Sequence, residues 1–309
     1  MLSGVKFSIQ LATERVDQPA EFLTAAAIGE MALAAESAGF DACFVTDHPI
    51  PDDEWLASGG HHALDPFVAL SFAAAATTRI RLHTNLLILP YRNPFLTAKA
   101  AATLDVASGG RLILGVGAGY LEAEFAALGV DRAQRNELSD EALMVLKRAW
   151  GETGLDFRGA GFEARGVTAL PHPQQRPHPP IWIGGNSKRA IRRAVEHAQG
   201  WAPFPALAAV AERTGTAAIA SLDDLRPRLA YAQEQANRAG RNEPLEIIFI
   251  PLGFSMRRGM GAAVERLAND LPAYAEAGVT WLSLGVPCET RAEYCDRVRE
   301  LGAALAPLR

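Results

Sequence analysis

The sequence predicts an α/β fold, a (β/α)8 TIM barrel with an insertion between its fourth and fifth strands. Short runs rich in β-branched and aromatic residues alternate with longer Ala-rich segments of helical period, which is typical of a parallel sheet covered by helices. This unit occurs eight times, and eight units close a barrel. The chain has 309 residues, 49% of them hydrophobic, which is enough for a large core.

The first four units occupy the N-terminal part of the chain. The expected strand and helix pairs are 5–11 with 20–37, 41–46 with 66–76, 80–86 with 94–107, and 111–116 with 121–128. Gly39 follows the first long helix and ends it. Pro66 and Pro94 stand where helices begin, a position at which the missing N–H of proline costs nothing.

The middle of the chain is less regular. A long helix is expected over 136–150, and glycines then separate two short runs, as in a hairpin. We therefore place an insertion at about 151–179, before the fifth strand. The last four expected pairs are 181–183 with a helix from 187, 200–202 with a helix ending near 239, 245–252 with 262–277, and 279–284 with 292–305. Neither a repeat nor a linker divides the chain, so 1–309 is predicted to be a single domain.

Composition limits the classes of binding partner and the cellular compartment that we expect for this protein. A formal net charge of -5 argues against a nucleic-acid partner, which would require a basic surface. Cys43, Cys288 and Cys295 show no Cys-x-x-Cys or metal-ligand spacing, so we expect a reduced, cytoplasmic protein. The N-terminus lacks the apolar core of a signal peptide, and no apolar run reaches the roughly 18 residues that span a bilayer, so no membrane association is expected.

The residues just past each strand end are the candidates for chemistry, because the loops there form the working face of a (β/α)8 barrel. The second strand ends in Asp47 and His48. An imidazole at the barrel mouth could hydrogen-bond a ring or act as acid or base near neutral pH. Equally, both side chains could satisfy main-chain groups of a turn. The sequence alone leaves these two interpretations open.

The next two strand ends differ in character. The third strand continues as the apolar run Leu86–Leu89, which on pattern alone indicates more core. The fourth strand ends in the alternating glycines Gly115, Gly117 and Gly119, followed by Tyr120, and such glycines let a ligand or another backbone approach closely. Their spacing and position are not those of a dinucleotide-binding Gly-x-Gly-x-x-Gly motif.

The fifth strand ends in Gly184-Gly185-Asn186-Ser187, immediately before a helix. Free N–H groups at a helix N-terminus beside two glycines suit a phosphate, and we favour this over an ordinary helix cap by Asn186 or Ser187. His61 and His62 lie in the loop after the second strand. No metal site is predicted there, because the side chains of adjacent histidines diverge; they either line a substrate pocket or are solvated.

In this order, the motifs resemble the luciferase-like monooxygenase superfamily, and in particular its branch of oxidoreductases that use the deazaflavin coenzyme F420. The strongest stretch is TTRIRLHTNLLILPYRNPFLTAKAAATLDVASGGRLILGVGAG at 77–119, supported by GFDACFVTDHP at 39–49 and RPHPPIWIGGNS at 176–187. The resemblance covers most of the chain, and so long an ordered set is more specific than any single motif.

The resemblance implies a cofactor site at the barrel mouth. Asp47 and His48 would lie beside the cofactor ring, with His48 at the ring edge or at the group being reduced. The run 86–88 would form a bulge behind the ring, which in this family often contains a non-proline cis peptide. The residues implied to bind the cofactor are Asn85, Leu86, Leu87, Ile88, Gly117, Ala118, Gly119, Tyr120, Gly184, Gly185, Asn186 and Ser187.

The resemblance also implies a reaction. The bacterial luciferase branch has basic and acidic side chains where this chain has Ala118 and Gly185, so main-chain N–H groups would hold the phosphate, as expected for F420. Coenzyme F420 would exchange a hydride between its C5 and a small organic substrate, with His48 as proton donor or acceptor and Asp47 orienting it. The alternatives are an FMN-dependent monooxygenase that uses O₂ and a cofactor-free barrel with a binding or structural role. A homodimer is the expected assembly of such barrels.

Overall fold

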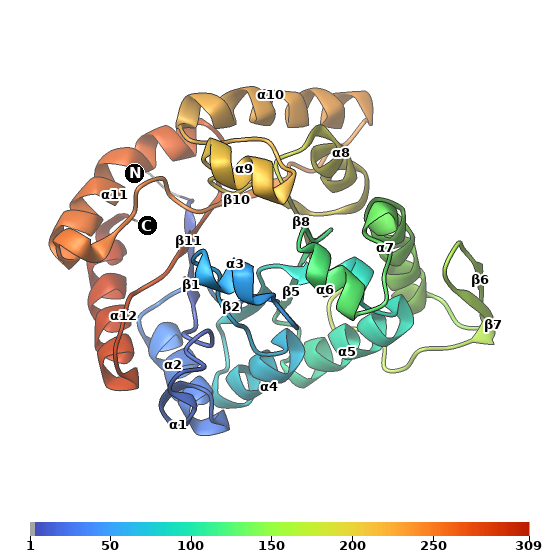
Figure 1. Ribbon diagram of the computed structural model, residues 1–309, viewed down its shortest axis with the longest axis horizontal. Helices are drawn as coiled ribbons and strands as arrows, with labels where there is room; N and C mark the ends of the chain where they lie inside the picture. Colours follow the sequence, from blue (N-terminus) through green and yellow to red (C-terminus); the bar gives the residue numbers. More distant parts are fainter. Residues whose placement is uncertain (1–3, 309) are drawn as a thin grey trace.

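The computed structural model describes residues 4–308, apart from the side chain of Arg213, and its central feature is a closed barrel of parallel strands ringed by helices (Figure 1). The barrel strands are β1 (Lys6–Gln10), β2 (Ala42–Val45), β3 (Arg81–Thr84), β5 (Leu112–Gly117), β8 (Ile181–Gly184), β9 (Gly200–Ala202), β10 (Glu246–Phe249) and β11 (Trp281–Leu284). The pairings of β1 with β11 and of β3 with β5 complete the ring. The predicted (β/α)8 barrel is confirmed.

The surrounding helices are α2 (Ala25–Ser37), α4 (Pro66–Ala76), α5 (Pro94–Ala107), α7 (Arg135–Gly151), α8 (Lys188–His197), α10 (Leu222–Arg238), α11 (Met260–Glu276) and α12 (Arg291–Leu305). Several begin at a side-chain cap, because the first N–H groups of a helix have no partner inside it. Thr24 caps α2, Asp65 caps α4 and Asn93 caps α5. Pro66 and Pro94 occupy the first helical position, as the sequence predicts.

Residues 4–308 also contain four short α-helices, α1 (Pro19–Phe22), α3 (Asp53–Ala57), α6 (Glu122–Ala127) and α9 (Ala208–Thr214), and four single-turn 3₁₀ helices, at Leu89–Tyr91, Arg132–Gln134, Met256–Arg258 and Ala306–Leu308. In Figure 1, α3, α6 and α9 lie toward the centre of the ring, over the barrel opening. The helix predicted over 20–37 is two helices, because the Oγ1 of Thr24 accepts from the N–H of Ala27 and starts a new one.

The fourth unit differs from its prediction. The segment 121–128 was expected to cover the barrel wall, but there α6 spans only six residues and belongs to the mouth. The covering helix of this unit is α7, which packs against α5. The insertion follows α7 as the antiparallel pair β6 (Leu155–Arg158) and β7 (Glu163–Val167), which projects from the barrel in Figure 1 and confirms the predicted hairpin.

The third strand is shorter than predicted. Strand β3 ends at Thr84, the Asn85–Leu86 peptide bond is cis, and the two-residue strand β4 (Leu87–Ile88) then pairs with β5. The apolar run beyond the strand is therefore a bulge at the barrel mouth, as the family resemblance implies, and its residues are not uniformly core.

Side chains close the opposite end of the barrel. The indole N–H groups of Trp182 and Trp281 donate to Oε2 and Oε1 of Glu246 at 3.2 and 3.0 Å, and the two indole rings are 5.1 Å apart. All three residues lie at or near the N-terminal ends of their strands, so the open end is the C-terminal one. Within residues 4–308, no helix is long and apolar enough to span a bilayer.

Candidate active site

Two adjoining cavities lie at the C-terminal ends of the strands. The inner cavity, of about 230 Å³, lies among β2, β3, β9, β10 and β11, and the outer cavity, of about 290 Å³, lies beside β5 and the start of α8. Leu86, Ile88, Tyr120 and Phe204 line both cavities, so the two are parts of one cleft. A larger groove of about 650 Å³ between α10 and α11 contains none of the predicted site residues.

Most of the predicted site residues line this cleft. In the inner cavity these are Asp47, His48, Asn85, Leu86, Ile88 and Tyr120. In the outer cavity they are Leu86, Ile88, Gly117, Ala118, Gly119, Tyr120, Gly184, Gly185 and Ser187. Residues from four separate segments, each following a barrel strand, thus meet in one place, although no two of these segments are adjacent in sequence.

Leu87 and Asn186 were predicted to contact the cofactor, but the structure places their side chains elsewhere. Leu87 is fully buried in the core under the helices, because successive residues of β4 point to opposite sides and only Leu86 and Ile88 face the cleft. Asn186 donates both amide hydrogens, to the carbonyls of Phe204 and Ala217, and its Oδ1 accepts from the N–H of Phe204. Its amide therefore ties three loops together and is not free to bind phosphate.

Asp47 fixes the bulge and does not orient His48. Its Oδ2 accepts from the N–H of Ile88 at 2.9 Å, and its Oδ1 accepts from Arg92 Nη2 at 2.7 Å. The predicted orienting role is wrong, because both carboxylate oxygens point toward the bulge. Burial raises the pKa of the Asp47 carboxyl, although Arg92 and the N–H of Ile88 oppose this shift.

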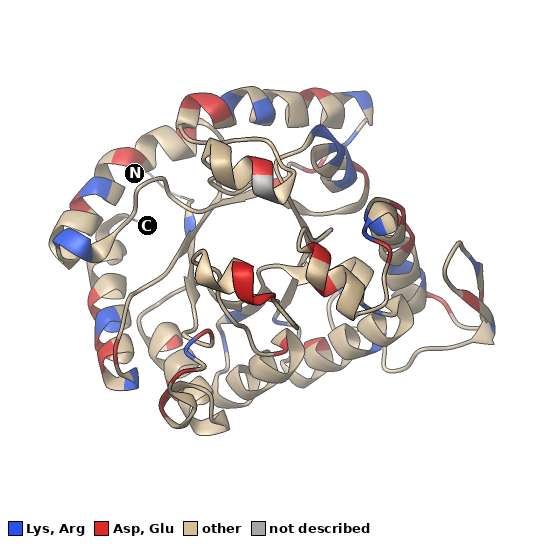
Figure 2. Ribbon diagram, viewed as in Figure 1, with Lys and Arg blue, Asp and Glu red and all other residues tan. Residues whose placement is uncertain are grey.

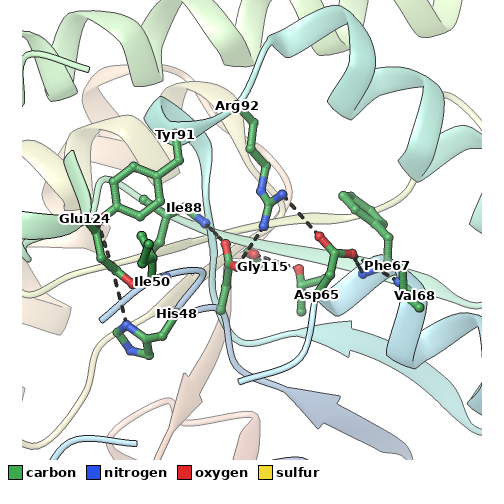
Figure 3. A network of polar contacts seen from close by, with 12 residues as sticks. His48, Ile50, Asp65, Phe67, Val68, Ile88, Tyr91, Arg92, Gly115 and Glu124 are labelled. Atoms are coloured by element: carbon green, nitrogen blue, oxygen red, sulfur yellow. Dashed lines mark hydrogen bonds and ion pairs between the residues drawn. The ribbon is translucent and has the colours of Figure 1, made fainter. Parts of the chain in front are cut away.

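The carboxylate beside His48 is Glu124, which the sequence did not single out. Its Oε2 lies 3.6 Å from Nδ1 of His48 and accepts from the Tyr91 hydroxyl at 3.0 Å, while its Oε1 accepts from the N–H of Ile50 at 3.3 Å (Figure 3). A signal was available: Leu121, Glu124 and Leu128 share one helical face, so this glutamate stands on an apolar stripe.

Aromatic groups surround His48. Its ring centroid lies 4.4 Å from that of Trp55 and 5.0 Å from that of His61, and Tyr120 is 6.0 Å away. Burial and the neighbouring His48 and His62 lower the pKa of His61 to about 4, so His61 is neutral near neutral pH. His61 lines the inner cavity, with its Nε2 3.2 Å from Oγ1 of Thr46.

The glycines of the cleft make room for the bulge. A Cβ on Gly119 would lie 2.8 Å from Cγ2 of Ile88, and a Cβ on Gly184 would overlap the side chain of Leu86. Gly119 also has a φ of +75°, which favours glycine. The sequence predicts that a ligand or another backbone approaches these glycines closely. In this structure, the side chains of Leu86 and Ile88 do so.

Three arginines line the outer cavity, and the sequence interpretation missed them: Arg135, Arg189 and Arg193. Arg189 and Arg193 lie one turn apart on α8, a spacing visible in the sequence, and both pair with Asp140, at 3.0 and 2.5 Å. Ser187 is the N-cap of α8 and accepts from the N–H of Ala190. No acidic side chain belongs to the described lining of this cavity, so a helix N-terminus and cations face it together.

The fold and site together define a class of protein: a (β/α)8 barrel with a cofactor-sized cleft at the C-terminal strand ends, which is the position of barrel active sites. Residues 1–279 match the family model described as luciferase-like monooxygenase. The chain belongs to this family, whose members are oxidoreductases and monooxygenases.

Curated relatives include users of both cofactors. An uncharacterized protein of Mycobacterium tuberculosis is 27% identical over 290 residues, which cover 88% of this chain and 91% of the relative. An FMNH₂-dependent dimethylsulfone monooxygenase of Pseudomonas putida is 31% identical over 176 residues, 56% of this chain and 46% of the relative. An F420-dependent glucose-6-phosphate dehydrogenase of Microbacterium testaceum is 31% identical over 176 residues, 56% and 50% of the two chains.

Solved structures agree on the fold. The monooxygenase RslO1 from Streptomyces bottropensis superposes with a TM-score of 0.77 at 23% identity, over 98% of this chain and 99% of that one. The coenzyme F420-dependent tetrahydromethanopterin reductase from Methanopyrus kandleri gives a TM-score of 0.73 at 17% identity, over 99% of both chains. At these identities the likeness concerns the barrel alone.

Proposed function

We propose that this chain is an F420-dependent oxidoreductase that transfers a hydride between C5 of the deazaflavin and a small organic substrate. The outer cavity carries the proposal, because Arg135, Arg189 and Arg193 line it beside the N-terminus of α8, with no acidic side chain in its described lining. The tail of F420 continues beyond its phosphate as a chain of carboxylates, whereas FMN ends at its phosphate. Arg135 forms no ion pair with a described residue, and Arg189 and Arg193, which also pair with Asp140, would add further donors for the longer anion.

The described residues fit such a cofactor. Leu86 and Ile88 line both cavities from the bulge and would support the back of the ring, which Asp47 holds in place through the N–H of Ile88. The main-chain N–H of Ser187, at the start of α8, would meet the phosphate. When bound, the deazaflavin supplies a C5 that gives or takes the hydride. His48 lines the inner cavity and would give or take the proton that accompanies it.

The inner cavity suits an uncharged substrate. Ile248, Ile250 and Phe204 form much of its wall, and its described lining contains neither lysine nor arginine. A phosphorylated sugar would leave its anionic group without a cation there, at a large desolvation cost. We infer a small, largely apolar alcohol or carbonyl compound, or another unsaturated one, as the substrate class.

Titration of the purified protein with F420 and with FMN tests the cofactor, by fluorescence and absorbance. We expect F420 to bind more tightly, and Arg189→Ala to weaken it about 10-fold because one charge-assisted contact is worth roughly 1.5 kcal/mol. Arg192→Ala, on the same helix but outside the cavity lining, is the matched control. Tight FMN binding without F420 binding would overturn the choice.

The second candidate is a monooxygenase that uses reduced FMN and O₂, favoured by the 31% identity to the dimethylsulfone monooxygenase. FMN binding with O₂ consumption would select it. Failure to bind either cofactor would leave the third alternative, a barrel with a binding or structural role.

We also propose that residues 1–309 act as one catalytic domain in a homodimer, through the uncharged helix α4 and the adjoining Leu33 of α2. Helix α4 contains no charged residue and appears entirely tan in Figure 2. Val68 and Phe72 lie one turn apart on it and are 57% and 39% exposed, and Leu33 of the adjacent α2 is 47% exposed. Val68→Asp should convert a dimer to a monomer in light scattering; an unchanged mass would contradict this assignment.

The cytoplasmic location stays a prediction. The three cysteines are free and buried.

A further inference from the structure

We infer that Glu124 is a positioning residue that sets the tautomer of His48, keeping the hydrogen on Nδ1 and the lone pair of Nε2 toward the inner cavity. The role of Nε2 toward a substrate rests on the proposed function. The tautomer of His48 does not, because it depends on the protein alone.

Glu124 is a buried hydrogen-bond acceptor at the barrel mouth. It is only 1% exposed, although it lies on the short helix α6 at the barrel mouth. Its two oxygens accept from the Tyr91 hydroxyl and the N–H of Ile50, so both are used as acceptors. Burial and the adjacent Glu124 raise the pKa of Tyr91, which keeps this phenol protonated and donating. Each carboxyl oxygen can accept more than one hydrogen bond, so a further donor can approach Oε2.

The only ion pair that the described residues form with Glu124 is with His48. Nδ1 of His48 is buried and has no hydrogen-bond partner within normal distance, and Oε2 of Glu124 lies 3.6 Å from it. A lone pair on Nδ1 would face a carboxylate oxygen across this gap, and an N–H there is attracted to it. The electrostatics therefore place the hydrogen on Nδ1.

The consequence is at the other nitrogen. His48 lines the inner cavity, and Nε2 is the ring nitrogen that does not face Glu124. With the hydrogen on Nδ1, Nε2 of the neutral ring is an acceptor. His48 thus accepts the hydroxyl proton when a substrate alcohol is oxidised, and after protonation it returns that proton from Nε2 when a carbonyl is reduced.

The test is an NMR measurement of the histidine ring nitrogens in the cofactor-free protein. Protein labelled with ¹⁵N-histidine gives two-bond correlation patterns that distinguish an Nδ1–H from an Nε2–H ring, and the His48→Gln spectrum identifies the His48 signals. We expect an Nδ1–H pattern in the parent protein and a change to mainly Nε2–H in Glu124→Gln. An Nε2–H pattern in the parent, or the same pattern in both proteins, would overturn the inference.

Two controls make the result specific. Glu122→Gln lies on the same helix, but its side chain is 82% exposed, so it should leave the His48 signals unchanged. Tyr91→Phe keeps the carboxylate and should keep Nδ1–H, which provides a second reading if Glu124→Gln folds poorly; loss of Nδ1–H there would contradict the assignment. If neither cofactor binds, the proposed function fails while the tautomer is still measured.

Turnover supplies an independent reading. Glu124→Gln should lower kcat by about 100-fold with little change in KM, because general base catalysis contributes at least that much and the substrate does not touch Glu124. A rise in KM at constant kcat would indicate a role in the shape of the cavity and would contradict positioning.

Discussion

The main-chain N–H of Ile88 donates to Oδ2 of Asp47 at 2.9 Å, so the end of the second strand holds the bulge that follows the third. Arg92, just beyond the bulge, binds the other oxygen of the same carboxylate at 2.7 Å. One buried side chain thus holds the end of the bulge and the arginine that follows it. The shape of the bulge therefore depends on a charge, and not on the apolar run alone.

Asp47→Asn should therefore loosen the bulge. The substitution leaves Arg92 facing a neutral amide in a partly buried site, and the loss of one partner of a buried ion pair costs about 3 kcal/mol. We expect that loss in urea unfolding, with weaker cofactor binding. The control is Asp65→Asn, because Asp65 binds the same arginine at 3.3 Å with a side chain that is 44% exposed, and should cost less than about 1 kcal/mol. Equal losses in the two variants would refute this account of the bulge.

His48→Ala should separate chemistry from binding. Removing a general acid or base lowers turnover by roughly 10²- to 10⁴-fold, whereas the bulge and the outer cavity, which would hold the cofactor, stay intact. The measurements are kcat and the cofactor Kd on one preparation. His62→Ala, in the same loop region as His61 but exposed, is the matched control. Unchanged turnover in His48→Ala would remove this residue from the mechanism.

The barrel was predictable because strand and helix periods recur with little interruption, and because strand ends of a barrel share one face. That rule placed Asp47, His48 and Gly184 correctly in one cleft. It could not assign partners: adjacency suggested that Asp47 orients His48, whereas the fold brings Glu124 to the imidazole from a different unit. Which of Glu122 and Glu124 turns inward depends on how α6 lies on the mouth, which a tertiary contact decides.

Asn186 shows the same limit. Its position at a helix start is readable from sequence, and the resemblance implied a phosphate contact. The loops whose carbonyls take its amide hydrogens, at Phe204 and Ala217, lie far along the chain. No local sequence pattern indicates that these carbonyls need a donor. The Asn186 amide therefore looks available in the sequence, although all of its hydrogen-bonding groups are used in the fold.

Gly184→Ala should disturb the cleft by a steric route. A Cβ at this position would overlap the side chain of Leu86, so either the bulge or strand β8 must move. Overpacking of this kind costs about 1–3 kcal/mol, and we expect weaker cofactor binding as well. Gly151→Ala, at the exposed end of α7 with nothing within 4 Å of its Cβ, should leave both properties unchanged. Normal binding by Gly184→Ala would show that Leu86 can move without consequence.

His83 should make the fold sensitive to acid. This residue is fully buried beside Trp182, with ring centroids 4.6 Å apart, and neither of its nitrogens has a hydrogen-bond partner. Burial, with a smaller contribution from Arg81, lowers its pKa from 6.5 to about 3. Between these two values the unfolded chain binds a proton that the folded chain does not, so stability rises with pH and falls as pH is lowered.

The expected size is roughly 1.4 kcal/mol per pH unit for one such group, in the window from 6.5 down toward 3. His83→Leu removes the titrating ring from the core, so the variant should lose less unfolding free energy than the parent between pH 6.5 and 4.5, whatever its stability at pH 7. Urea unfolding at both pH values measures that difference directly. His61 remains in both proteins and cancels in the comparison, although burial also lowers its pKa, to about 4. If the unfolding free energies of the two proteins depended identically on pH, His83 would not be the source of the acid sensitivity.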